Sequence, residues 1–144
     1  MKLQKERILL ITIRVSLGLV FLWAFLDKLF GLGFSTAAEA SWFAGGSPTT
    51  GYLLYGTGGP LAGIFQALAG QVWVDWLFMM GLLGIGAGLI SGYALRVAAY
   101  GGSVMLMLMY ISAFPPEHHP FLDEHVIYTI TLLLIAHRGS NTLT

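Results

Sequence analysis

The chain has 144 residues, of which 56% are hydrophobic and only 10% are charged. A soluble domain of this size needs more polar surface, so the composition excludes an ordinary soluble protein. Seven basic and seven acidic residues give no net charge, and no basic stripe with interleaved aromatic residues indicates nucleic-acid binding. The chain has no cysteine, which excludes disulfides, thiolate nucleophiles, iron–sulfur clusters held by cysteine and covalent haem attachment.

Four apolar segments are candidates for membrane-spanning helices, because about 20 apolar residues cross the ~30 Å hydrocarbon core of a bilayer. The last and shortest has an apolar core of Val126–Ala136. The sequence therefore predicts an all-α integral membrane protein, a four-transmembrane-helix bundle that forms one domain. The predicted spans are Ile8–Phe30, Asp75–Leu95, Arg96–Phe114 and Asp123–His137.

The positions of the charges agree with four spans. If the N-terminus lies inside, six of the seven basic residues fall near the cytoplasmic face, where Lys and Arg accumulate in short loops. Lys28 is the exception. Six of the seven acidic residues fall on the opposite side, and Glu6 is the exception. We therefore expect a multi-pass protein of the cell membrane with both termini in the cytoplasm.

Residues 34–74 are the longest segment outside the predicted spans, and we expect them to cap the bundle on the extracytoplasmic side. Thr36–Phe43 has the composition of a short interfacial helix, with Trp42 at the level of the lipid headgroups. Residues 61–74 are apolar but too short to span, and glycine and glutamine interrupt them. They are expected to form a half-inserted or surface-lying helical region.

The second predicted span carries glycine at a spacing of four, at positions Gly84, Gly88 and Gly92. Such residues share one helix face and let another backbone approach closely. We expect this face to serve packing within the bundle. The alternative is a contact between two copies of the chain, which would make the protein a homo-oligomer.

The segment from Phe114 to Tyr128 concentrates the polar residues of an otherwise apolar chain. It holds three of the four histidines and three of the seven acidic residues. On a helix that begins near Asp123, His125 and Tyr128 lie on one face and can point into the bundle together. Asp123 and Glu124 also have a structural explanation, because acidic side chains in the first turn interact favourably with the helix dipole.

A metal site in this segment is an alternative. Histidine and carboxylate side chains are ligands for Zn, Cu or non-haem Fe, and the candidates are His118, His119 and His125. Their spacing fits no compact motif, because two are adjacent and the third follows six residues later, across a proline. The sequence therefore gives only weak support to a metal site.

The first span carries three ionisable residues, which are costly inside a membrane, usually paired, and often functional. Arg14 can snorkel to the cytoplasmic interface or serve a binding site. Asp27 and Lys28 end the span on the same side as the histidine-rich segment, where they can join its acids and histidines in one polar cluster. The competing explanation is a set of ion pairs that ties helix ends together.

Five motifs occur in order along the chain: Arg14-x3-Gly18-Leu-Val-Phe-Leu-Trp-Ala-x2-Asp27-Lys28-Leu29, Gly46-Ser-Pro-Thr, Gly56-Thr-Gly-Gly-Pro60, Trp76-Leu-Phe-Met-Met-Gly-Leu-Leu-Gly-Ile-Gly86 and Pro120-Phe-Leu-Asp-Glu-His-Val-Ile-Tyr128. Together they resemble the DoxX family of small membrane proteins, over nearly the whole length from Arg14 to Ala136. The resemblance implies a four-helix membrane bundle and a link to the DoxD-type subunits of thiosulfate:quinone oxidoreductase.

From this resemblance we expect a membrane subunit of a quinone-linked oxidoreductase that acts on small reduced sulfur compounds. Its cofactor would be a quinone, and its partner a redox subunit, because the chain has no redox centre of its own. In this hypothesis Lys28 attracts an anion, while His125 and Tyr128 hydrogen-bond a quinone carbonyl or relay protons. The residues expected to bind the cofactor are Arg14, Asp27, Asp123 and Glu124.

Two other functions stay open at this point. A non-catalytic scaffold that recruits a partner protein would explain the absence of any cofactor motif. A metal-binding membrane protein would use the histidine-rich segment. The sequence does not decide whether the chain is catalytic by itself.

Overall fold

The structure is a computed structural model, and it describes the backbone of residues 1–142 and the side chains of residues 1–139. The described residues contain helices and no strand. Four helices are long: α1 (Lys2–Phe30), α3 (Val72–Ser91), α4 (Leu95–Ser112) and α5 (Glu124–Thr142). Three are short: the 3₁₀ helix η1 (Ala38–Ala40), the π-helical turn η2 (Tyr52–Gly56) and α2 (Ala62–Gln66).

By length and composition, α1, α3 and α4 can each cross a membrane. The expected all-helical fold is therefore confirmed, and three of the four predicted spans coincide with helices that are candidates for crossing a membrane. The fourth predicted span coincides with α5, whose apolar part is flanked by polar residues such as Glu124 and Arg138. Its crossing of the membrane stays a prediction.

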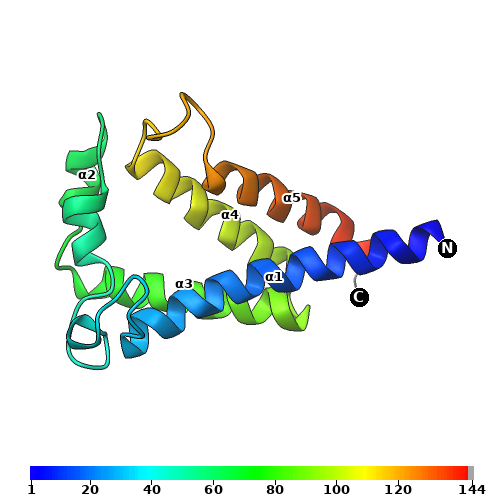
Figure 1. Cartoon of the computed structure of the whole chain (residues 1–144), viewed down its shortest axis with the longest axis horizontal. Helices are drawn as coiled ribbons and strands as arrows, with labels where there is room; N and C mark the ends of the chain where they lie inside the picture. The colour runs from blue at the N-terminus through cyan, green and yellow to red at the C-terminus, as the bar shows by residue number, and fades with distance from the viewer. Residues whose placement is uncertain (143–144) are drawn as a thin grey trace.

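The long helices form two antiparallel pairs (Figure 1). α1 lies along α3, α4 lies along α5, and the pairs contact each other mainly through α3 and α4. α3 and α4 meet at the tight turn formed by residues 92–94 and diverge toward the other end of the molecule, where η2 and α2 lie. The buried core draws on all four long helices, and its members include Phe21, Leu89, Ala99 and Leu132.

α1 and α3 approach each other closely where Gly18 and Gly86 meet. A methyl group on Gly86 would lie 2.9 Å from the backbone nitrogen of Leu22. A methyl group on Gly18 would lie 2.7 Å from a side-chain carbon of Ile90 and 3.1 Å from the carbonyl oxygen of Gly86. Any larger residue must push the two backbones apart, so these glycines set the distance between α1 and α3.

We expect Gly86→Ala to lower the free energy of unfolding by about 1–3 kcal/mol, because overpacking a tight contact forces backbone shifts. Gly84→Ala is the matched control on the same helix, since a methyl group there would have no atom within 4 Å. Alanine is the better helix former, so that change is expected to be neutral or stabilising by up to about 1 kcal/mol. Unfolding in detergent micelles, followed by circular dichroism, measures the free energy of unfolding of both variants. Equal losses in the two variants would contradict the close contact between α1 and α3 at Gly86.

The glycine face predicted on the second span packs within the chain at two of its three positions. A methyl group on Gly88 would lie 2.7 Å from Cβ of Ala98, and one on Gly92 would lie 2.8 Å from the guanidinium of Arg14. Gly92 also ends α3 with φ 79°, a conformation that favours glycine. The expected packing role is confirmed for these two residues. Gly84 instead borders open space between α3 and α4.

Residues 31–71 connect α1 to α3 and contain less helix than predicted. Within Thr36–Phe43 only η1 is helical, and within 61–74 the helix α2 is five residues long. Gly70 adopts φ 81° and separates α2 from α3, which already begins at Val72. Just after η1, the N–H groups of Trp42 and Phe43 donate to the carbonyl oxygens of Lys28 and Leu29 at 2.8 and 3.0 Å. These bonds hold the segment against the end of α1.

Candidate functional site: a cavity between α3 and α4

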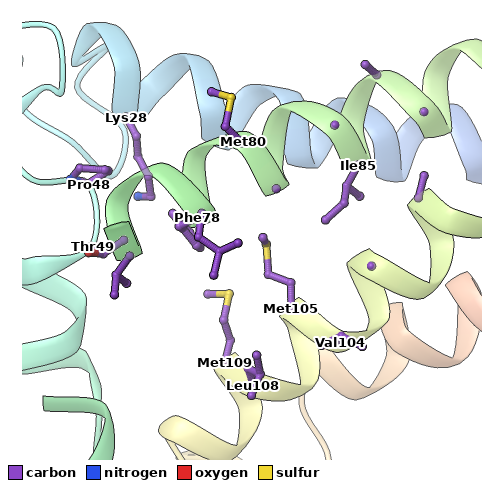
Figure 2. Close-up of a pocket in the computed structure, with 18 of the residues that line it drawn as sticks. Lys28, Pro48, Thr49, Phe78, Met80, Ile85, Val104, Met105, Leu108 and Met109 are labelled. Atoms are coloured by element: carbon purple, nitrogen blue, oxygen red, sulfur yellow. The ribbon is translucent and has the colours of Figure 1, made fainter. Parts of the chain in front are cut away.

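A cavity of about 830 Å³ lies between α3 and α4, where the two helices diverge (Figure 2). Its volume falls within the range of roughly 300–1,000 Å³ that is usual for small-molecule sites. The walls are almost entirely apolar, with Phe78 and Ile85 on α3 and Met105, Leu108 and Met109 on α4. The cavity therefore suits a ligand with a substantial apolar part.

The cavity opens at the outer surface of α3 and α4, where its rim residues are exposed. Leu77 on α3, and Val97 and Val104 on α4, all line it and are 66%, 73% and 60% exposed. Because both helices are apolar enough to cross a membrane, exposed side chains along them would contact lipid chains. A hydrophobic molecule could thus enter from the side, between α3 and α4, without passing through water.

One end of the cavity is polar. Lys28, Thr49, Tyr52 and Ser112 line it near the start of α3 and the end of α4, and Figure 2 shows Lys28 and Thr49 on this side. The hydroxyl of Tyr52 lies 2.8 Å from Oγ of Ser112 and donates to the carbonyl oxygen of Met109 at 3.2 Å. Lys28 is the one charged side chain among the described residues that line the cavity.

Residues 47–58, which we name the bridge segment, connect the two diverging helices at this polar end. Ser47 and Thr49 donate from their hydroxyls to Oδ1 of Asp75 on α3, at 2.7 and 2.5 Å. At the other end, the N–H of Gly58 donates to the carbonyl oxygen of Ser112 on α4 at 2.9 Å. Asp75 is buried, so its carboxylate needs these donors. The bridge segment therefore fixes how far α3 and α4 stand apart.

Asp27 is a structural residue in this arrangement. It is 1% exposed, and its carboxylate accepts hydrogen bonds from the N–H of Phe34, the N–H of Ser35 and Oγ of Ser35 at 3.2, 2.8 and 2.7 Å. These bonds shape the loop that leaves α1. Asp27 does not line the cavity. Its neighbour Lys28 does, and Nζ of Lys28 donates to Oγ of Ser35 at 3.3 Å.

The predicted site residues on α5 lie elsewhere. Asp123 caps this helix: Oδ1 accepts from the N–H groups of His125 and Val126 at 3.0 and 3.3 Å. Oδ2 of Asp123 lies 2.7 Å from Nδ1 of His125. Tyr128 packs against the core. None of these residues lines the cavity, and neither does Glu124.

The structure thus separates the predicted polar cluster into two parts. No hydrogen bond or ion pair between described side chains joins Asp27 or Lys28 to Asp123 or His125. The physical reason is that α1 and α5 belong to different helix pairs, which diverge at this end of the molecule (Figure 1).

The three histidines predicted as metal ligands do not form one group. His118 and His119 are exposed, and Nδ1 of His119 accepts hydrogen bonds from the N–H groups of Phe121 and Leu122 at 3.1 and 2.9 Å. The group of potential ligands in the described chain is instead Asp123, Glu124 and His125, whose ligand atoms lie within 4.8 Å of one another.

Arg14 lies near the opposite end of α3 from the polar end of the cavity. It is 8% exposed, and Nη2 donates to the carbonyl oxygen of Ile90 at 3.5 Å. A cation beside the last carbonyl groups of a helix interacts favourably with the helix dipole. Arg14 is thus buried against the end of α3, beside Gly92. It does not line the cavity, so it has no contact with a ligand bound there.

No family model, no curated protein and no solved structure matches this chain. The resemblance to the DoxX family therefore stays a prediction, and the candidate site rests on its own geometry.

Of the residues predicted from the sequence, Lys28 is the one that lies at the cavity. The sequence reasoning missed Tyr52, Thr49 and Ser112, because hydroxyl side chains in a loop or at a helix end carry no recognisable signal. One signal was present. Gly84 was interpreted as a packing residue, but a small side chain also leaves room for a ligand, and Gly84 lines the cavity.

Proposed function

We propose that this chain is the membrane subunit of a quinone-linked oxidoreductase, and that the cavity between α3 and α4 holds the quinone. The observation that carries the proposal is the cavity itself: about 830 Å³, apolar walls on two helices that can cross a membrane, and one polar end. A membrane quinone has the matching two parts, a ring with polar carbonyl groups and a long apolar chain. The resemblance to DoxX proteins supports the same assignment.

The proposed orientation places the ring at the polar end. Nζ of Lys28 would donate a hydrogen bond to a ring carbonyl, a role that the sequence analysis gave to His125 and Tyr128, whereas Lys28 was expected to attract an anion. The apolar chain would lie along Met105 and Leu108 and leave the cavity between α3 and α4. His125 and Tyr128, expected to contact the quinone, have no direct role in this proposal because they lie outside the cavity.

The membrane topology belongs to the proposal as well. With α5 as the fourth span, both termini lie in the cytoplasm, and the polar end of the cavity faces the other side. α5 runs antiparallel to α4, and its residues Leu132 and Ile135 are fully buried against the bundle, as expected for a member of it. The bridge segment and α2 would then lie at the extracytoplasmic interface.

A bound quinone would supply the capacity to accept electrons. The chain contributes the site: it excludes water with apolar walls and orients the ring with Lys28. The electrons would come from a partner redox subunit that oxidises a small reduced sulfur compound, as the resemblance implies.

Tryptophan fluorescence tests the proposal, because quinones quench it at short range and Trp73 lines the cavity. We would compare a variant that keeps Trp73 alone with one that keeps Trp23 alone, the other tryptophans being replaced by phenylalanine. Trp23 is a matched control, since it is 47% exposed against 58% for Trp73 but lies outside the cavity. Saturable quenching of Trp73 by a short-chain quinone, with only linear quenching of Trp23, is the expected result. Linear quenching of both would contradict the proposal and favour the scaffold alternative.

A metal-binding protein is the second candidate function, favoured by the close approach of Asp123, Glu124 and His125. His125 already uses Nδ1 on Asp123, so it would bind a metal through Nε2. Elemental analysis of the purified protein tests this candidate. A transition metal in stoichiometric amount that is lost in His125→Ala would support it, and a metal-free protein would dismiss it.

A further inference from the structure

The polar end of the cavity has a positive charge, on Lys28, that forms no ion pair with a described carboxylate. Lys28 is half-buried, and no carboxylate oxygen of the described residues lies within 4.0 Å of Nζ. The neighbouring carboxylate, on Asp27, is occupied by its three donors in residues 34 and 35. An ammonium beside apolar walls gains more from an anionic partner than one in water does.

Among the hydrogen-bond donors at this end of the cavity, Lys28 is the group left to contact a ligand. The hydroxyl of Thr49 donates to Asp75, and the hydroxyl of Tyr52 donates to the carbonyl oxygen of Met109. An ammonium has three donor hydrogens, and Lys28 uses one of them on Ser35. Lys28 therefore has hydrogen bonds left for a head group, and a carboxylate adds to them an attraction between opposite charges that a neutral oxygen lacks.

The rest of the cavity fixes the other part of the ligand. Its walls are apolar, and its exposed rim residues Leu77, Val97 and Val104 lie on helices that are apolar enough to cross a membrane. A ligand that enters there comes from the bilayer, with a chain thin enough to lie between two helices. The two ends together describe an amphiphile with one apolar chain and one negative charge.

We infer that the cavity also binds a fatty acid, a single-chain lipid with a carboxylate head, and that this lipid competes with the quinone. Its carboxylate would pair with Nζ of Lys28 and its chain would follow the wall between α3 and α4. The inference rests on the proposed function for the competition, but the binding of the fatty acid itself depends only on the cavity and on Lys28.

Competition for Trp73 quenching tests the inference. In the variant with Trp73 alone, at a pH well above the carboxyl pKa, palmitate should displace a short-chain quinone at a concentration at least about tenfold below that of hexadecanol. Lys28→Met should remove the difference between the acid and the alcohol, whereas Lys28→Arg should keep it. Acetate, which has the charge without the chain, should not displace the quinone.

The outcomes separate the two proposals. Equal displacement by palmitate and hexadecanol would overturn this inference while leaving the quinone site in place. Retention of radiolabelled palmitate that depends on Lys28, without saturable quenching by quinone, would support the fatty-acid site and overturn the proposed function. Displacement by acetate would show that the site takes a free anion, which contradicts a lipid ligand. The comparison of acid and alcohol uses the protein with Lys28 intact, so it stands even if Lys28→Met misfolds.

Discussion

Replacing Asp27 with alanine is expected to lower the free energy of unfolding by about 3–5 kcal/mol. The carboxylate is 1% exposed and accepts three hydrogen bonds, from the N–H of Phe34 and from the N–H and hydroxyl of Ser35. Alanine would remove all three hydrogen bonds that hold residues 34 and 35 against the end of α1, and a hydrogen bond to a charged group contributes about 1.5–3 kcal/mol. Chemical unfolding in detergent micelles, followed by circular dichroism, measures the loss.

Two variants make this result specific. Glu39→Ala removes an exposed carboxylate from the same connecting segment and is expected to change stability by no more than about 0.5 kcal/mol. In the original protein the donors bond to both carboxylate oxygens of Asp27, and Asp27→Asn keeps only one side-chain oxygen. Its loss in free energy of unfolding should therefore be intermediate. An Asp27→Ala protein as stable as the original would show that the loop after α1 does not depend on this carboxylate.

The positions of the four long helices could be predicted from hydropathy, but the ends of the helices could not. The first span was expected from Ile8, whereas α1 begins at Lys2, because the polar first turns stay helical beyond the apolar part. Its end at Phe30 was predicted correctly, since Gly31 takes φ 67° and stops the helix. Hydropathy marks where a helix meets lipid, and backbone geometry decides where it ends.

The packing of the helices could be predicted only in part. The glycines at a spacing of four on the second predicted span indicated a close contact, and Gly88 and Gly92 each make one. The pairing of Gly18 with Gly86 depends on which helices are neighbours and on their relative rotation, and one sequence shows neither. The divergence of the two helix pairs also depends on how the helices pack against one another. The cavity between them therefore could not be predicted from one sequence.

The candidate site was predicted only at Lys28. The contact between Asp123 and His125 lies outside the cavity and was not predicted, although it joins residues two apart at a helix start. Lys28 was singled out as an ionisable residue at the end of a span, and it lies at the cavity. The prediction that Lys28 and His125 share one polar cluster assumed a compact bundle. The two helix pairs diverge at this end of the molecule, so the assumption does not hold.

Gly84→Phe is expected to weaken quinone binding at least about tenfold, because the new ring would occupy the cavity. Gly84 lines the cavity from α3, and a methyl group there would have no atom within 4 Å, so a larger side chain has room to grow into the space. The change also replaces a poor helix former in the middle of α3, which favours the fold. Quenching of Trp73, measured in the variant that keeps this tryptophan alone, gives the affinity.

Gly63→Phe is the matched control for the same chemical change. Gly63 is exposed in α2, a methyl group there would have no atom within 4 Å, and the residue does not line the cavity. Its replacement should leave the quinone affinity unchanged. A folded Gly84→Phe protein that binds quinone as tightly as the original would place the quinone outside the space between α3 and α4. The fatty-acid site would not be excluded by that result, since it depends only on the cavity and on Lys28.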